Sequence, residues 1–253
     1  MSDRFQHAPL IATIAAVTVL AWIYLFHLSL QMSAAPGETM MAAMARATTA
    51  PWTARDVFLT FIMWTVMMVG MMAPSATPVL LLVANAPRTD RQRVPPVAWF
   101  GAGYVLVWIG FSAIAAITQW ALHEGTFLSP AMTASSPRIA GAILIGAGLY
   151  QLTPLKHMCL THCRSPIDFL MTHWRQGPLG PLGMGVHHGL YCVGCCWALM
   201  AVLFAVGVMN LAWVAALAVI ILVEKTASST VLVSTIAGAV LVIGGAIKLV
   251  SNA

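Results

Sequence analysis

Charged residues are scarce in this chain. They make up only 8% of the 253 residues, with 12 Lys and Arg and 7 Asp and Glu, where an average soluble domain has about 25%. So few charges cannot cover a 26.9 kDa globule in water, which excludes a soluble monomer. Disorder is excluded too, because it requires low hydrophobicity, and 60% of this chain is apolar. The net charge of +5 therefore predicts basic cytoplasmic loops rather than a nucleic-acid-binding surface.

Familiar catalytic signatures are also lacking. The sequence has no Ser/His/Asp arrangement, P-loop or dinucleotide-binding fingerprint, and no internal repeat. It contains no separate soluble domain. We therefore expect a single membrane domain over residues 1–253, whose chemistry depends on side chains within its hydrophobic runs.

Those runs predict an all-α, polytopic transmembrane helix bundle. A helix needs about 20 apolar residues to cross a bilayer. The seven predicted spans are Leu10–Gln31, Val57–Val83, Val97–Leu122, Arg138–Leu155, Val186–Met209, Leu211–Val223 and Thr230–Val250. The sixth is short, so the count falls to six if it is not a separate span. The first run is longer than the ~7–15 residues of a cleaved signal peptide, which favours a retained helix.

The loops predict an orientation in a bacterial inner membrane. One side carries Arg4, Arg88, Arg91, Arg93, Lys156, Arg164, Arg175 and Lys225, and the other carries Arg46, Arg55, Arg138 and Lys248. Basic residues concentrate on the cytoplasmic side, so we expect a cytoplasmic N-terminus. Residues 32–55 would form an external loop, and residues 156–185 a Cys/His-rich loop on the cytoplasmic side.

Thiols and imidazoles are concentrated in one window of the chain. All five Cys and five of the eight His lie between His157 and Cys196. The residues His188, Cys192, Cys195 and Cys196 have the spacing i, i+4, i+7 and i+8, which places them on one stripe of a helix. Cys159 and Cys163 are spaced i and i+4, with His162 beside Cys163. Gly185, Gly189 and Gly194 keep the neighbouring surface small enough for another helix to pack closely.

Such a window predicts a metal site. Thiolates select Cu(I), Zn or iron–sulfur clusters, and imidazole suits Cu, Zn, Fe and Ni. Two alternatives remain open. Buried cysteines can act simply as small hydrophobic residues. Cys192 and Cys195 also form a C-x-x-C motif, the spacing of dithiol oxidoreductases.

A methionine stripe marks the second predicted span. Met67 and Met71 lie on one row of the helix, and Met68 and Met72 lie on the row beside it. Thioether is a soft, uncharged ligand for Cu(I), and the M-x-x-x-M spacing looks like that of copper-uptake transporters of the Ctr type. Methionines can also fill gaps in a membrane core. The stripe therefore favours copper over zinc or an iron–sulfur cluster. It does not decide whether these methionines bind a metal or only pack in the membrane core.

Glu224 and Lys225 end the sixth predicted span. They can neutralise each other at the inner edge of the membrane. Ionisable residues at membrane depth are also functional candidates, so Glu224 could relay a proton or complete a metal shell.

Three blocks of sequence carry a resemblance to a known family. They are Met71–Pro78, Gln151–Arg164 and Gly189–Met200, with Gly207–Leu211 and Glu224–Lys225 after them. Together they resemble a bacterial family of unknown function described as predicted metal-binding integral membrane proteins. The resemblance runs from about Val57 to Lys225 and implies a multi-span fold that holds a metal.

We predict an integral membrane protein that binds a soft transition metal, with copper first, for transport or for delivery to another membrane protein. The predicted ligands are, in order, Cys192, Cys195, Cys196, Cys159 and Cys163, then His188 and His162, then Met67, Met68, Met71 and Met72. The alternatives are a dithiol oxidoreductase coupled to a quinone, a metal-dependent membrane enzyme, and a structural or assembly subunit of a membrane complex.

Overall fold

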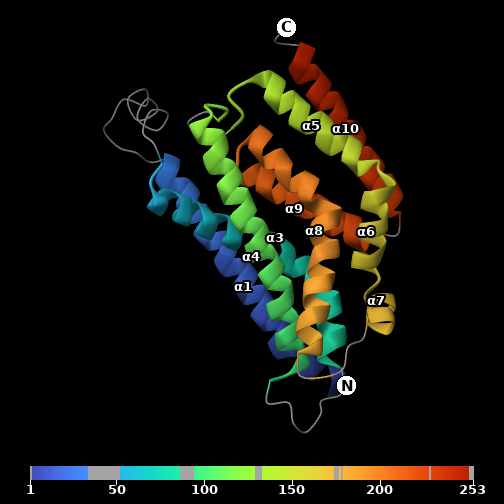
Figure 1. Ribbon diagram of the computed structural model, residues 1–253. Coiled ribbons are helices and arrows are strands. Elements are labelled where there is room, and N and C mark those ends of the chain that lie inside the picture. The colour runs from blue at the N-terminus through green and yellow to red at the C-terminus, as the bar shows by residue number, and fades with distance from the viewer. Residues whose placement is uncertain are drawn as a thin grey trace.

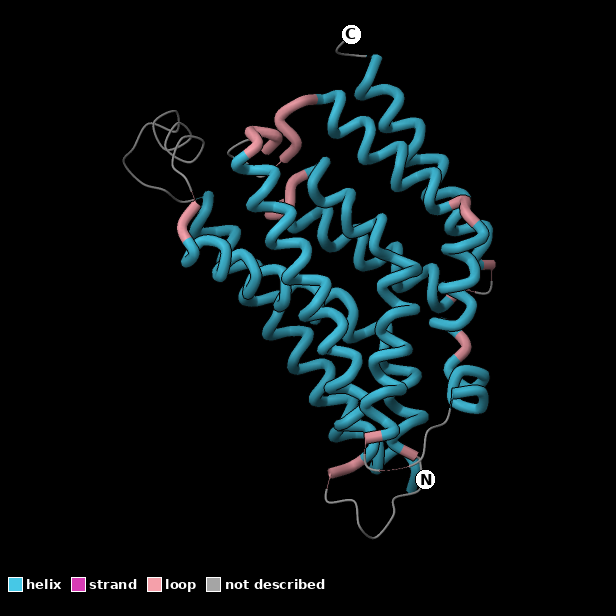
Figure 2. The backbone as a smooth tube through the Cα atoms, in the orientation of Figure 1, coloured by secondary structure: helices cyan, strands magenta, loops and turns pink. Residues whose placement is uncertain are grey.

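A computed structural model describes residues 2–33, 52–85, 94–128, 133–173, 177, 179–227 and 229–250. Its helices are α1 (Ser2–Ser33), α3 (Ala54–Ala84), α4 (Pro96–Glu124), α5 (Pro137–Gln151), α6 (Pro154–Arg164), α7 (Pro166–His173), α8 (Gly180–Val206), α9 (Leu211–Thr226) and α10 (Thr230–Val250) (Figure 1). The only β-structure in these residues is one isolated bridge, between Leu128 and Ala134. The predicted all-α fold is confirmed (Figure 2).

Within the described ranges, five helices are long and apolar enough to cross a membrane, namely α1, α3, α4, α8 and α10. A sixth crossing is formed only if α5 and α6, bent by 64° at their junction, count as one span. The lower predicted count of six, given for a sixth span that does not cross by itself, is reached when the bent pair counts as one span. Leu211–Thr226 does form a separate helix, but 16 residues at 1.5 Å each reach roughly 24 Å, short of the ~30 Å hydrocarbon core.

Proline breaks the fourth predicted span. Helix α5 ends at Gln151, and Pro154 begins α6 with the Thr153 side chain accepting a hydrogen bond from the backbone N–H of Lys156. Proline is favourable in a first helical turn but disrupts a helix interior. The bend that results turns α6 and its cysteines toward α8.

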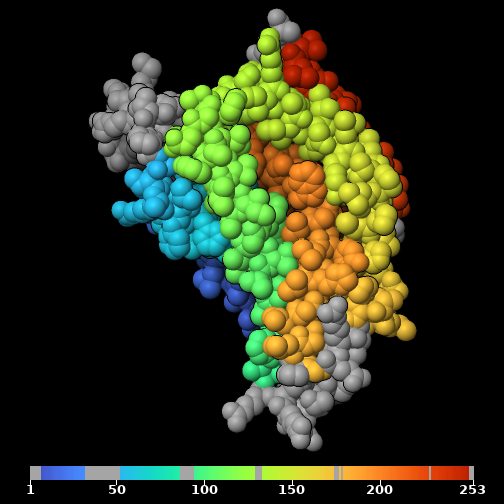
Figure 3. Space-filling view, viewed as in Figure 1, coloured from blue at the N-terminus to red at the C-terminus, as the bar shows by residue number. Residues whose placement is uncertain are grey.

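The segment 156–185, expected as a loop, is largely helical. It contains most of α6, all of α7 and the start of α8. The expected external loop 32–55 lies mainly outside the described residues, and α3 begins at Ala54. In the space-filling view, the orange atoms of α8 and α9 lie between the green of α4 and the yellow of α5 and α6 (Figure 3).

Glycines let α4 and α8 touch backbone to backbone. A Cβ atom on Gly185 would lie 2.0 Å from the Phe100 carbonyl oxygen, and one on Gly103 would lie 2.2 Å from the Leu182 carbonyl oxygen. Those distances leave no room for a methyl group. The close packing predicted from Gly185, Gly189 and Gly194 is thus observed at Gly185, and it brings Tyr104 against α8.

We expect Gly185→Ala to lower the free energy of unfolding by at least about 1–3 kcal/mol, the usual cost of overpacking, because backbone atoms must separate. The matched control is Gly110→Ala on α4, where an added Cβ meets nothing within 4 Å and helix propensity favours Ala by up to about 1 kcal/mol. Thermal unfolding in detergent, followed by circular dichroism, measures both changes. Equal stability of the two variants would contradict the packing described here.

Candidate metal centre

Four cysteine thiols gather in the core where α6 packs on α8. Cys192, Cys195 and Cys196 of α8 have exposed fractions of 1%, 2% and 1%, and Cys163 of α6 has 8%. Cys163 belongs to the same buried cluster of side chains as the three cysteines of α8. All four are free cysteines. We call these four side chains the thiol cluster.

Cys192 is the electrostatic centre of the thiol cluster. The Lys225 ammonium donates a hydrogen bond to its Sγ at 2.9 Å, and the Tyr104 hydroxyl lies 3.0 Å from the same sulfur. Lys225 also donates to the Ser75 hydroxyl at 3.0 Å. A buried ammonium requires partners of this kind, and a positive charge beside a sulfur suits a thiolate.

The other two thiols of α8 turn back onto their own helix. Cys195 Sγ and Cys196 Sγ donate to the Cys192 carbonyl oxygen at 3.1 Å and 2.9 Å. Among the described residues, no group of three or more His, Cys, Asp or Glu side chains is arranged to hold a metal ion. Ligation by these thiols would therefore require them to leave the carbonyl and rotate.

His188 lies one turn before Cys192 and has an exposed fraction of 2%. Its ring lies among those of Phe100, Tyr104 and Phe169. Its Nδ1 atom is buried with no hydrogen-bond partner among the described residues. A buried polar atom without a partner costs about 1–3 kcal/mol, so this nitrogen is a position where a ligand would add stability.

Cys159 and His162, two of the predicted ligands on α6, do not join the thiol cluster. Cys159 is partly exposed, and its Sγ would lie 2.8 Å from a Cβ built on Gly194. His162 is paired through Nδ1 with the Met158 carbonyl oxygen at 2.8 Å and stacks on Tyr191. Both residues therefore lie beside the thiol cluster, away from Cys192.

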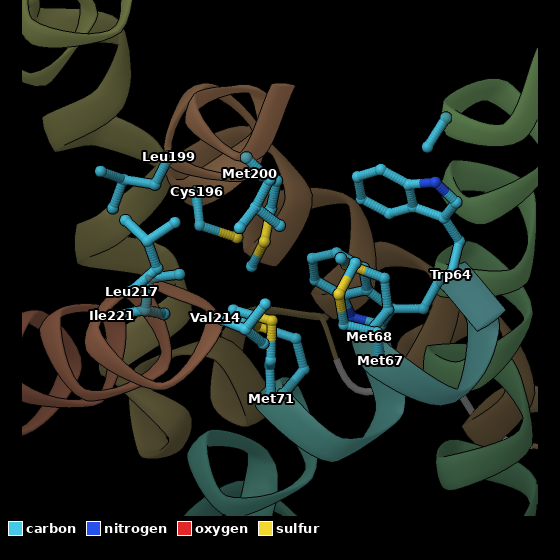
Figure 4. Close-up of a cluster of buried hydrophobic side chains, with 14 of the residues drawn as sticks. Trp64, Met67, Met68, Met71, Cys196, Leu199, Met200, Val214, Leu217 and Ile221 are labelled. Atoms are coloured by element: carbon cyan, nitrogen blue, oxygen red, sulfur yellow. The ribbon is translucent and has the colours of Figure 1, made fainter. Parts of the chain in front are cut away.

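The methionine stripe lies in the same buried core as the thiol cluster. Met67, Met68, Met71 and Met72 are 0–3% exposed and belong to one apolar cluster with Cys192, Cys195 and Cys196. Figure 4 shows Met71 of α3 pointing toward Cys196 and Met200 of α8. The side chains of the second and fifth predicted spans therefore meet.

The expected neutralising pair between Glu224 and Lys225 does not form. Glu224 Oε1 accepts hydrogen bonds from Lys156 at 2.6 Å, Gln151 at 2.9 Å and Ser234 at 3.0 Å, whereas Lys225 faces Cys192. Successive residues on a helix point about 100° apart, so adjacent charges face different neighbours. The sequence-based ligand set included neither Lys225 nor Tyr104, although polar groups within apolar helices are a signal of function.

A small cavity of about 30 Å³ adjoins the thiol cluster. Its lining includes Ser75, Pro78, Cys163, Arg164, Lys225 and Thr226. The cavity therefore borders a thiol of the cluster and the ammonium that contacts Cys192.

Comparison with known proteins gives one family. The family model described as PpoB2, copper chaperone, matches residues 61–248, a range that holds every described residue of the site. No curated protein and no solved structure matches.

Proposed function

Because the chain belongs to the PpoB2 copper chaperone family, we propose that it binds Cu(I) in the thiol cluster within a membrane and delivers it to another membrane protein. The observation that carries this proposal is the burial of four free cysteines in one cluster of the core, with Lys225 against the sulfur of Cys192. The family supports copper, and the five long apolar helices support a membrane location.

The donor set matches the chemistry of Cu(I). Thiolate and thioether are soft ligands that favour this ion, and imidazole at His188 is compatible with it. Cys192 is the first ligand in this proposal, joined by Cys163, Cys195 or Cys196. The Lys225 ammonium offsets the negative charge that two thiolates leave after binding one Cu(I).

Met67, Met68, Met71 and Met72 are proposed as weak neutral ligands along the path of the ion. A chaperone must release its cargo, and a series of weak sites permits both entry and exit, as in channels. The cavity beside Cys163 and Lys225 is the proposed opening through which copper is released. We further propose a bacterial inner membrane with the N-terminus in the cytoplasm, as the basic loops predict.

The test is the metal content of the full chain, purified anaerobically and reconstituted with Cu(I) or with Zn(II). We expect near-stoichiometric copper that resists a thiol-free chelator, with X-ray absorption showing sulfur as the main scatterer. Zinc should be retained less well. A chain that binds neither metal, yet forms a reversible Cys192–Cys195 disulfide on addition of quinone, would replace copper delivery with the dithiol oxidoreductase.

A further inference from the structure

Histidines and aromatic rings form a second cluster, outside the thiol cluster. The rings of His173 and His187 have centroids 4.5 Å apart at an angle of 75°. Phe169 contacts both of these rings, and Tyr191 contacts them as well. Helix α7 thus holds one imidazole against another on the first turns of α8. Both histidines are partly exposed, whereas His188 is buried.

A hydrogen-bond chain sets the tautomer of His173. The Thr172 hydroxyl donates its single hydrogen to the Asp168 carbonyl at 2.8 Å. The same hydroxyl lies 2.7 Å from His173 Nδ1, so with its hydrogen on the carbonyl it accepts from an Nδ1 that carries the proton. This arrangement leaves the lone pair on Nε2, which is how second-shell partners orient a histidine that binds a metal.

We propose that His173 and His187 form a second copper site, at the surface, which takes up Cu(I) before the thiol cluster receives it. This inference rests on the proposed function. Two imidazole nitrogens can hold one Cu(I). Imidazole is a borderline ligand that binds this ion less selectively than thiolate, so we expect this site to hold copper more weakly than the thiol cluster does. Because the thiol cluster would bind Cu(I) more tightly than His173 and His187, the ion would move from the histidines to the thiols.

The position of the pair supports this order. His187 directly precedes His188 in α8, and the rings of both contact Phe169. Behind His188 lies Cys192, one helical turn further along. Along α8, the donors that follow His187 are therefore His188, whose Nδ1 has no partner among the described residues, and Cys192. Copper stays Cu(I) throughout, and only its nitrogen and sulfur donors are exchanged.

The experiment counts copper in the full chain by Cu(I) titration against a chromophoric chelator. Wild type should bind one tight and one weak copper, and His173→Ala or His187→Ala should remove the weak one alone. His157→Ala, which changes another partly exposed histidine, should keep both. Thr172→Val keeps the rings but loses the orienting hydroxyl. It should weaken the outer copper by about 10- to 100-fold, as second-shell changes do.

A second background separates this inference from the proposed function. With Cys192, Cys195 and Cys196 changed to Ser, the weak copper should remain, with nitrogen scattering only, and should disappear when His187→Ala is added. Wild type that shows only nitrogen-bound copper would end the thiol proposal and leave the surface site standing. Identical weak binding in wild type, His173→Ala, His187→Ala and Thr172→Val would show that these rings only pack, and would overturn the inference.

Discussion

Replacing Glu224 with Met is expected to lower the free energy of unfolding by about 3–5 kcal/mol, the usual cost of removing one partner of a buried ion pair. Lys156 and Glu224 have exposed fractions of 0% and 2%, with Nζ and Oε1 2.6 Å apart. Gln151 of α5 and Ser234 of α10 donate to the same carboxylate. One carboxylate therefore joins four helices, and without it the Lys156 ammonium keeps only Gln151.

The matched control removes both charges. Lys156→Met with Glu224→Met should lie within about 1–2 kcal/mol of wild type, because apolar replacement of a whole buried pair is often neutral. Reversible unfolding in mixed detergent, followed by circular dichroism, measures the free energies. A double variant as unstable as the single one would show that the methionines disturb packing, and would contradict the role given to charge.

The sequence predicted which cysteines share one face of a helix because that signal is local. The spacing of Cys192, Cys195 and Cys196 defines one face of a helix in any fold, and the structure buries all three thiols. The glycines of α8 predicted close packing in the same way. Helix periodicity and residue size require no knowledge of distant parts of the chain.

Distant contacts could not be predicted in this way. Lys225 reaches Cys192 across 33 residues and Ser75 across 150, and no periodicity encodes which helix faces which. Cys163 joins the thiol cluster only because Pro154 breaks the fourth span and redirects α6. The bend between α5 and α6 and the shortness of α9, which has 16 residues, leave five helices that meet the length of a full span among the described residues.

The largest effect on copper is expected from Cys192→Ser. Second-shell changes already cost about 10- to 100-fold in metal affinity, so loss of the central soft ligand should lower Cu(I) affinity by more than about 100-fold. The fold should survive, since a serine hydroxyl can still accept from Lys225 and pair with Tyr104, the two partners that Cys192 Sγ has now. Cu(I) titration against a competing chelator measures the loss, and a thermal melt verifies folding.

Cys159→Ser is the matched control for this prediction, because it makes the same chemical change in the same window. Cys159 is partly exposed and packs beside Gly194 rather than within the thiol cluster, so its replacement should lower copper affinity by less than about 10-fold, below the second-shell range. Equal losses in the two variants would mean that copper lies between α6 and the outer face of α8. That result would move the centre away from Lys225. A larger loss in Cys192→Ser instead makes the sulfur that contacts the buried ammonium the principal copper ligand.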